Sequence, residues 1–370
     1  MIAFYCATPY HVMLCLFLAL EKYKTTKKIL IIANHFPQVN QIINTCYELN
    51  IFEVIYKIND HDNDALKHWS RRYRMFFFYK GLTEILQKYI CDKVLFFPGE
   101  MLVNSFIIKI VKSVNPNCEF SLVEDGIGSY LGNTLYEPNN KASFWLKLLK
   151  RDKYLKDIKY LYLLKPELLN FCSNYKIIKI DGCILKNQKL KEVLNRVFVP
   201  AKLPECDILM LQQPIKQDNK KYKDIDDRQF FLFDKIGKQF KNHSIYIKYH
   251  PRTKILPVVS NCKSIPAGVL FENALTPSIN NSIIISVYST AAFTPYFLGE
   301  YTPPLIFLYK ICKFDDISVS FTSFVENFAK LYSKVGGVVL IPNSIDELIS
   351  SIESVFSQRT TSNYYVKEQE

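Results

Sequence analysis

Continuous apolar runs that recur between helical patterns constrain the fold of this chain more than any other feature. The runs Ile2–Cys6 and Lys28–Ala33 are apolar at nearly every residue instead of alternating with polar ones. Strands of this kind are buried on both faces, which is typical of a parallel sheet covered by helices on its two sides. The sequence therefore predicts an α/β fold. Further strands are expected at residues 52–58, 93–97, 120–123, 207–211, 244–248, 282–287, 305–308 and 337–341.

Helical patterns separate these runs, and the alternating series occurs twice. A chain of 370 residues is long enough for two domains. The pattern loosens from residue 134 to 204, where Pro200 and Pro204 bracket a predicted linker. We therefore expect two doubly wound halves, 1–200 and 205–345, followed by a C-terminal helix and tail over 345–370. Helices are predicted at residues 12–22, 38–49, 65–89, 226–240 and 344–356, with a polar tail from Ser357 that is expected to fray.

The charge balance favours an anionic partner. The net charge is +12 and the isoelectric point is near 9.0, which suits nucleic acid, an anionic lipid surface or a negatively charged substrate. No nucleic-acid-binding module is recognisable, so we expect no nucleic-acid partner. The basic cluster from Arg71 to Arg74 is followed by Phe76, Phe77 and Phe78. It fits a phosphate contact, a membrane surface or a solvated helix face, and the sequence leaves these open.

Cysteine usage and hydropathy indicate a cytoplasmic protein. The ten cysteines form no CxxC pair and most lie in apolar segments, which fits buried, reduced thiols. The first apolar segment has no basic residues before it and is interrupted at Thr8-Pro9-Tyr10-His11, so we predict strand, turn and helix there instead of a signal peptide. No apolar run reaches about 18 residues, so no membrane span is expected. Peripheral contact with the inner face of the cytoplasmic membrane remains compatible with the charge.

Two adjacent acids follow one predicted strand. The strand through Val123 runs into Glu124-Asp125-Gly126, and Gly128 follows. Side chains alternate along a strand, so the two carboxylates share one direction only where the chain turns, and the glycines permit that turn. A carboxylate at the carboxyl end of a parallel strand can take a proton from an attacking hydroxyl. A polar strand-to-loop turn without chemistry would have the same sequence.

A histidine and a proline end another predicted strand. His250-Pro251 follows the run 244–248, and Lys248 and Arg252 flank it. Proline restricts the backbone of the preceding residue, which limits where the imidazole points. Basic neighbours suit a phosphate, and His250 can donate a proton or a hydrogen bond to a leaving phosphate. The alternative is a histidine that is simply satisfied at a strand end.

Small hydroxyl residues follow a third strand. Ser286, Ser289 and Thr290 lie after the run 282–287 and before a predicted apolar helix. Free N–H groups at a helix start can bind a phosphate, and simple N-capping is the alternative. Gln212-Gln213-Pro214 and Thr8-Pro9-Tyr10-His11 are weaker features, the second as a possible acceptor contact. His35, His61, His68 and His243 are assigned no role. The stronger features all fall at carboxyl ends of predicted strands, where doubly wound halves bind ligands in the cleft between them.

With these residues the chain resembles the bacterial sialyltransferases, specifically the lipooligosaccharide sialyltransferase family and its polysialyltransferase relatives. The shared motifs are an acidic-acidic-glycine motif, a His-Pro motif and a later serine-threonine motif, matched here by Glu124-Asp125-Gly126, His250-Pro251 and Ser289-Thr290. The resemblance implies a GT-B-like fold of two Rossmann-like domains facing a cleft. It also implies an inverting transfer from CMP-sialic acid to a cell-surface glycan, lipooligosaccharide or capsule, without a metal or other cofactor.

The same resemblance implies roles for the site residues. The N-terminal domain would meet the acceptor and the C-terminal domain would bind the CMP-sugar. An acid of the first motif would be the general base, with Glu124 favoured over Asp125, and His250 would engage the phosphate and act as general acid. Asp226 or Asp227 is an alternative base. The expected donor-binding residues are Gly126, Gln213, Pro214, Lys248, Pro251, Arg252, Ser286, Ser289 and Thr290.

Alternative functions remain open from the sequence. A GT-B enzyme with another donor, such as CMP-Kdo, would also use a His-Pro motif and a Gln-Pro segment. A non-catalytic capsule-assembly or sugar-binding protein could have the same scaffold. Asp62-Asn63-Asp64 has the spacing of a metal-binding DxD motif, but polar loops produce this spacing often, so no metal site is expected there.

Overall fold

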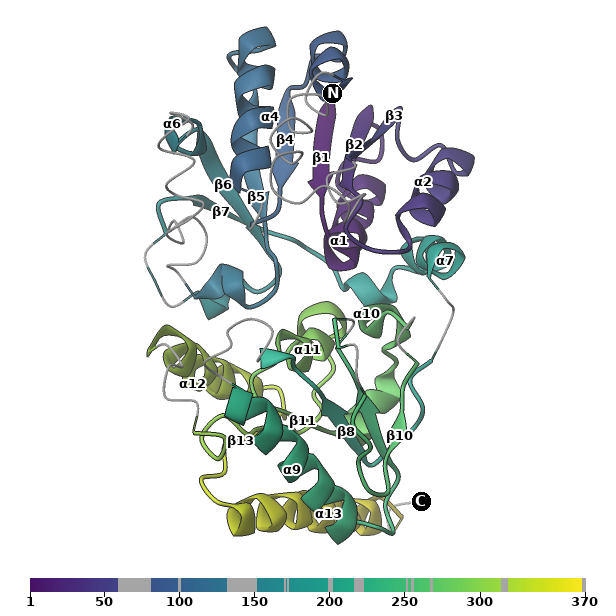
Figure 1. Cartoon of the computed structure of the whole chain (residues 1–370), viewed down its shortest axis with the longest axis vertical. Coiled ribbons are helices and arrows are strands. Elements are labelled where there is room, and N and C mark those ends of the chain that lie inside the picture. Colours follow the sequence, from purple (N-terminus) through teal and green to yellow (C-terminus); the bar gives the residue numbers. More distant parts are fainter. Residues whose placement is uncertain are drawn as a thin grey trace. The chain divides into compact units, whose positions relative to one another are not determined.

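The computed structural model describes residues 1–58, 81–98, 101–131, 152–169, 171, 173–198, 202–215, 223–250, 252–253, 256–266, 269–313 and 319–367. The chain divides into two compact units, Met1–Phe198 and Val199–Glu370 (Figure 1). The boundary falls next to Pro200, at the predicted linker. No helix among the described residues is long and apolar enough to cross a bilayer.

The described strands of unit 1 form one parallel sheet of seven strands in the order β3-β2-β1-β4-β5-β6-β7. The chain starts in the middle, moves to one edge and then returns to build the other half, which is the doubly wound arrangement. The strands are β1 (Ile2–Cys6), β2 (Lys28–Ala33), β3 (Val54–Ile58), β4 (Lys93–Phe96), β5 (Glu119–Val123), β6 (Ile158–Leu163) and β7 (Lys176–Lys179).

Helices connect these parallel strands, as right-handed crossovers require. α1 begins at a Thr8 cap, whose hydroxyl accepts from the His11 N–H, and has proline in its first turn. The described residues of unit 1 include the helices α1 (Pro9–Leu20), α2 (Val39–Glu48), α4 (Met101–Val114), α6 (Asp152–Leu155) and α7 (Gln188–Val197), and residues 81–88 are helical as well. The described residues of this unit also contain the 3-10 turns η1 (Gly128–Tyr130), η2 (Pro166–Leu168) and η3 (Ile184–Lys186).

The described strands of unit 2 form a six-stranded parallel sheet in the order β10-β9-β8-β11-β12-β13. This repeats the winding of unit 1. The strands are β8 (Ile208–Leu211), β9 (Ile245–Lys248), β10 (Lys263–Ser264), β11 (Ile283–Ser286), β12 (Leu305–Phe307) and β13 (Val339–Leu340). Two doubly wound, Rossmann-like units confirm the predicted α/β fold class.

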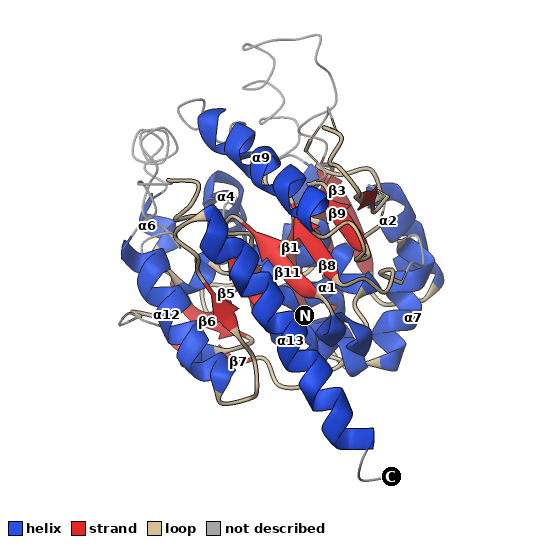
Figure 2. Ribbon diagram, turned by 90° about the horizontal axis from the view of Figure 1, so that it is seen from below, coloured by secondary structure: helices blue, strands red, loops and turns tan. Residues whose placement is uncertain are grey.

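The longest helices of unit 2, α9 (Lys223–Gln239) and α13 (Ile345–Lys367), lie side by side (Figures 1 and 2). Ser344 caps α13 by accepting from the Glu347 N–H at 3.1 Å. The helix continues past Ser357 to Lys367, so the expectation of a frayed tail from Ser357 was wrong. The other elements of unit 2 are α10 (Phe271–Ala274), α11 (Thr294–Gly299), α12 (Val319–Ser333), η5 (Pro277–Asn281) and η6 (Thr290–Ala292).

The continuous apolar strands are buried as predicted. Every residue of β1, β2, β8 and β11 is buried, because helices cover both faces of each sheet. The described cysteines form no disulfide, and most of them are buried in these layers. This arrangement agrees with the expectation of buried thiols that behave as small apolar side chains.

Three expectations about the elements need correction. The stretch from 134 to 204 is not loose throughout, since β6, β7 and α7 lie within it. The apolar helix expected after β11 is a short 3-10 turn, η6, followed by the six-residue α11. β10, α4, α10 and α12 were not predicted at all. The predicted helix 65–89 lies mostly outside the described residues, as do the basic cluster near Arg71 and the Asp62-Asn63-Asp64 segment.

An aromatic cluster anchors the segment after β11. The ring of Phe293 stacks on Phe307 with centroids 5.1 Å apart, and its edge contacts with Phe328 and Phe324 span 4.8 and 5.4 Å. Each such pair contributes about 0.5–1.5 kcal/mol beyond the burial of its area. Because Phe293 directly follows η6, this cluster holds the Ser289-Thr290 turn at the carboxyl end of β11.

Candidate active site

Each sheet has one place where the winding reverses. In unit 1 it lies between β1 and β4, and in unit 2 between β8 and β11. Connections leave such neighbouring strands toward opposite faces of the sheet, which opens a crevice beside their carboxyl ends. The residues that follow these strands and their sheet neighbours, β5 in unit 1 and β9 in unit 2, are therefore the candidate ligand contacts of each unit.

The acidic motif forms a tight turn at the end of β5. Gly126 has a φ of +64°, which L side chains rarely adopt. The Asp125 N–H donates to the Ser129 hydroxyl at 2.8 Å, and η1 follows directly. The turn sends the two acids in different directions. Glu124 is completely buried, whereas the Asp125 side chain is 40% exposed.

Both oxygens of the Glu124 carboxylate are occupied. Oε1 accepts from the Tyr10 hydroxyl at 2.8 Å. Oε2 accepts from the Leu164 N–H at 2.7 Å and from the Tyr130 hydroxyl. The Tyr130 hydroxyl accepts in turn from the Lys165 N–H at 3.1 Å. Glu124 therefore ties the first turn of α1 and the end of β6 to the turn after β5.

Burial raises the pKa of Glu124 to about 7, from an ordinary value of 4.5. The donors Leu164, Tyr130 and Tyr10 oppose this shift, and the neighbouring Asp125 charge adds to it. A buried carboxyl that titrates near neutrality resembles a catalytic acid or base. Since no face of this group reaches solvent, its environment also fits a structural role.

Asp125 faces a buried histidine from the first turn of α1. His11 Nε2 lies 3.0 Å from Asp125 Oδ1, and only 3% of the His11 side chain is exposed. The distance is in ion-pair range, but the ring N–H does not point along the line to the oxygen, so the contact is no well-formed hydrogen bond. The Ala7 N–H donates to His11 Nδ1 at 3.1 Å.

Phe97 completes this arrangement from the end of β4. Its ring stacks on His11 with centroids 4.1 Å apart and planes 10° apart. Asn104 of α4 donates to the Phe97 carbonyl at 3.2 Å, which fixes that segment. Three neighbouring strand ends, those of β1, β4 and β5, thus meet around Asp125. Tyr10 and His11 were only a weak feature of the sequence, and nothing in it indicated Phe97.

In unit 2, His250 follows β9 and its ring orientation is set by a local contact. The Arg252 N–H donates to His250 Nδ1 at 3.1 Å. Because Nδ1 accepts, the proton of the neutral ring lies on Nε2. A nitrogen that bears this proton can donate to a phosphate oxygen. Arg252 is exposed, and Pro251 lies outside the described residues.

The two glutamines after β8 brace the neighbouring strand ends. Gln212 Oε1 accepts from the His250 N–H at 3.0 Å and from the Thr253 hydroxyl at 2.7 Å. Gln213 Oε1 accepts from the Tyr288 N–H at 2.8 Å. These contacts join the carboxyl ends of β8, β9 and β11. Binding of the CMP-sugar by Gln213, as expected from the sequence, would therefore compete with its contact to the Tyr288 N–H. Pro214, the next residue, is buried.

Lys248 has a buried structural contact. Its ammonium donates to the Val269 carbonyl at 2.9 Å. Burial lowers the pKa of Lys248, and the charge of Glu272 counteracts this. Burial also raises the pKa of Glu272. Lys248 thus holds the segment before α10, and a phosphate would compete with that contact.

The hydroxyl segment after β11 is capped by its own side chains. Ser289 Oγ accepts from the Ala291 N–H at 3.3 Å, and the Ser289 N–H donates to Ser286 Oγ at 3.2 Å. The three-residue η6 is too short to have the dipole of a long helix. Ser286 is buried, whereas Thr290 is exposed. The hydrogen bond expected for simple N-capping is thus present at Ser289, and the exposed Thr290 side chain is accessible to a ligand.

The alternative acids lie on α9. Asp226 is partly buried and Asp227 is exposed, both in the first turns of the helix. Their chain neighbour Gln229 accepts from the Gln213 N–H at 3.0 Å and donates to the Gln213 carbonyl at 2.9 Å. The helix is therefore fixed to the end of β8.

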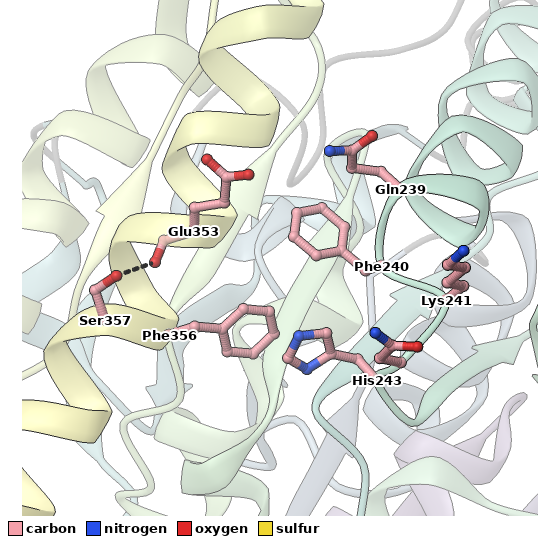
Figure 3. A pocket seen from close by; sticks show the side chains of 8 residues that line it. Gln239, Phe240, Lys241, His243, Glu353, Phe356 and Ser357 are labelled. Carbon is pink, nitrogen blue, oxygen red and sulfur yellow. Dashed lines mark hydrogen bonds between the residues drawn. The ribbon is translucent and has the colours of Figure 1, made fainter.

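A surface hollow of about 360 Å³ occurs in unit 2. It is lined by the end of α9 and by α13, and the His243 ring stacks on Phe356 with centroids 4.1 Å apart (Figure 3). The second nearby ring, Phe240, lies 6.0 Å from Phe356. None of the predicted site residues lines this hollow, and its stacked rings are part of the packing of α9 on α13.

Comparison with known proteins gives one family. A family model described as glycosyltransferase family 52 matches residues 41–296. No curated protein matches the chain.

Several solved structures are similar at low identity. Arabidopsis thaliana UGT89C1 complexed with UDP-L-rhamnose is 9% identical with a TM-score of 0.49, covering 99% of this chain and 93% of that one. MurG from Acinetobacter baumannii is 10% identical with a TM-score of 0.46, covering 95% and 90%. Glycyrrhiza uralensis UGT73P12 complexed with glycyrrhetinic acid 3-O-monoglucuronide is 8% identical with a TM-score of 0.45, covering 99% and 98%.

Proposed function

This chain belongs to glycosyltransferase family 52, the bacterial sialyltransferase family, and we propose that it transfers sialic acid from CMP-sialic acid to a cell-surface glycan, lipooligosaccharide or capsule. The observation that carries the proposal is the pair of strand-end sites. Unit 1 holds an exposed carboxylate, Asp125, in a rigid polar frame. Unit 2 holds His250, whose Nδ1 accepts from the Arg252 N–H so that the proton of the neutral ring lies on Nε2.

Asp125 is the proposed general base. From the sequence Glu124 was favoured, but its burial and its three hydrogen-bond donors suit a structural group. A base must reach the hydroxyl whose proton it takes. Asp125 has the exposure that this requires. Asp227 is also exposed, so it serves as the competing candidate in the experiments below.

The proposed reaction is a single displacement with inversion. Asp125 accepts the proton of the acceptor hydroxyl while that oxygen forms a bond to the anomeric carbon of the sialic acid. The bond from this carbon to the phosphate oxygen of CMP breaks, and its electron pair stays on the phosphate. His250 Nε2–H donates to the departing phosphate, because negative charge grows there. Thr290, Ser289 and Arg252 supply further donors to that phosphate.

No metal or other cofactor is needed in this scheme, since the fixed donors of unit 2 would stabilise the leaving phosphate. We further propose that the enzyme works in the cytoplasm, with its basic surface against anionic lipid at the inner membrane face.

Donor profiling tests the proposal. The full chain would be incubated separately with CMP-N-acetylneuraminic acid and CMP-Kdo, with galactoside acceptors, with and without EDTA. We expect CMP release from the sialic acid donor alone, unaffected by EDTA, and a product of opposite anomeric configuration. Turnover of CMP-Kdo without turnover of CMP-sialic acid would refute the sialyl assignment. If neither is turned over and the Asp125→Asn and His250→Ala variants leave cell-surface glycan unchanged, the protein is non-catalytic.

A further inference from the structure

His11 is a buried polar side chain that lies next to Asp125, the proposed general base. The whole residue is 2% exposed, and its ring stacks on Phe97. A buried polar ring is costly unless its nitrogens have partners. Nδ1 has one, the Ala7 N–H. For Nε2, Asp125 Oδ1 at 3.0 Å is the carboxylate within reach.

The Ala7 contact fixes the tautomer of this ring. A nitrogen that accepts a hydrogen bond carries no proton, so the neutral ring has its proton on Nε2, on the side of Asp125. A second proton on Nδ1 would break the Ala7 contact and bury an unpaired N–H. The N–H of the neutral His11 ring therefore lies on the side of Asp125, and the ring does not pass a proton from one nitrogen to the other.

The surroundings keep the His11 ring in place, whereas Asp125 is anchored beside it through its backbone. The stacking on Phe97, which Asn104 fixes through its carbonyl, prevents the imidazole from tilting away. Asp125 is anchored through its backbone N–H by Ser129, whereas its side chain is two-fifths exposed. The position of the Asp125 carboxylate oxygens thus depends on the Nε2–H group of His11 beside them.

We propose that His11 is a positioning residue that holds the Asp125 carboxylate toward the acceptor hydroxyl. The inference rests on the proposed function of Asp125 as the base. It assigns a role to a residue of the Thr8–His11 turn that does not itself meet the reacting atoms. A carboxylate that rotates away from its productive geometry loses rate without weakening substrate binding. His11 thus acts on kcat and leaves the acceptor KM unchanged.

Two substitutions separate this role from simple packing. In His11→Asn the side-chain oxygen occupies the place of Nδ1 and keeps the Ala7 contact, but nothing reaches Asp125. In His11→Gln the amide nitrogen occupies the place of Nε2 and can donate to Asp125, but the Ala7 N–H loses its acceptor. The first variant preserves the turn and removes the contact to the base, and the second does the opposite.

The activity measurement uses CMP release from CMP-N-acetylneuraminic acid by the full chain, with a galactoside acceptor. We expect His11→Asn to lower kcat about tenfold to a hundredfold with an unchanged acceptor KM and a near wild-type Tm. His11→Gln should recover most of kcat although its Tm falls. If activity instead follows Tm, so that His11→Asn is active and His11→Gln is inactive, His11 has only a structural role and the inference fails.

Asp125→Asn keeps the two hypotheses distinguishable. If this variant retains wild-type turnover, the proposed base is wrong and the inference falls with it. If it is inactive while His11→Asn retains full kcat, only the inference is overturned. In an inactive Asp125→Asn background, His11→Asn should add no further loss, because both act through one carboxylate.

A measurement without turnover completes the test. NMR of the full chain with ¹⁵N-labelled histidine reports which ring nitrogen is protonated. We expect His11 with Nδ1 unprotonated and Nε2 protonated, and an Nε2 signal that moves in Asp125→Asn. A proton on Nδ1, or an Nε2 signal indifferent to Asp125→Asn, would overturn the proposed contact.

Discussion

Glu124 and Asp125 are neighbours in the chain, but their carboxylates lie in opposite environments. Glu124 is fully buried, with donors on both oxygens, and the Asp125 side chain is 40% exposed beside His11. The cause is the turn at Gly126, whose positive φ ends the strand directly after the pair. One acid of the motif therefore supports the site, and the other is able to meet a substrate.

This division predicts unequal effects of two near-isosteric substitutions. Asp125→Asn removes the proposed base and should lower kcat by about a hundredfold to ten-thousandfold. Glu124→Gln should keep kcat within about tenfold, because that side chain touches no solvent. CMP release from CMP-sialic acid measures both. Asp227→Asn is the matched control and should retain activity. A large loss in Glu124→Gln or Asp227→Asn, with an active Asp125→Asn, would move the base assignment to that residue.

The buried Glu124 also predicts a pH dependence of stability. Its pKa is raised from 4.5 to about 7 in the folded chain. Between these values the folded state keeps a proton that the unfolded state has lost, so stability falls as pH rises through this window and levels off above it. The size is on the order of 3 kcal/mol.

Urea unfolding at pH 4.5 and pH 7.5 would measure this effect in the wild type and in Glu124→Gln. Other groups titrate in both proteins, so the difference between their pH dependences isolates Glu124. We expect the variant to lack the decrease that Glu124 causes. Parallel pH curves for the two proteins would show that Glu124 titrates at its ordinary pKa.

Gln212 should support nucleotide binding through His250. In Gln212→Ala the His250 N–H and the Thr253 hydroxyl lose their shared acceptor, which frees the segment that carries the imidazole. The loss of about 1.4 kcal/mol corresponds to a tenfold weaker affinity for CMP. Protection of the full chain by CMP against thermal unfolding measures this.

Gln239→Ala is the control for that experiment, since Gln239 is an exposed residue at the end of α9, beside the hollow of Figure 3. It should bind CMP as the wild type does. If CMP also protects Gln212→Ala fully, the position of His250 does not depend on its hydrogen bond to Gln212. If CMP protects neither the wild type nor the control, unit 2 is not the nucleotide-binding unit.

The aromatic cluster behind η6 predicts a purely structural effect. Phe293→Ala would leave a cavity among Phe307, Phe324 and Phe328 and should destabilise the chain by about 3–5 kcal/mol. Phe231→Ala is the control, because that ring is 51% exposed, and its effect should stay within about 0.5 kcal/mol. Equal losses of unfolding free energy in both variants would contradict the assignment of Phe293 to the core.

Most of the strands were predictable because burial on both faces leaves a continuous apolar run. β6 and β7 were missed for the same physical reason. β7 lies at the sheet edge with both of its end residues exposed, and β6 contains exposed Lys159. Their sequences therefore lack the continuous apolar pattern of a central strand. The helix expected after β11 failed because Pro295 and the packing of Phe293 divide that segment into η6 and α11.

The sequence by itself determined the two doubly wound units and the placement of Asp125, Gln212 and His250 at strand ends, because periodicity and chain direction are local properties. The tertiary structure alone decided which acid of the pair is buried, and that His11 and Phe97 lie beside the other. Those contacts join β1, β4 and β5, and residues more than a hundred positions apart meet only when the sheet assembles. Proximity of this kind leaves no pattern along the chain.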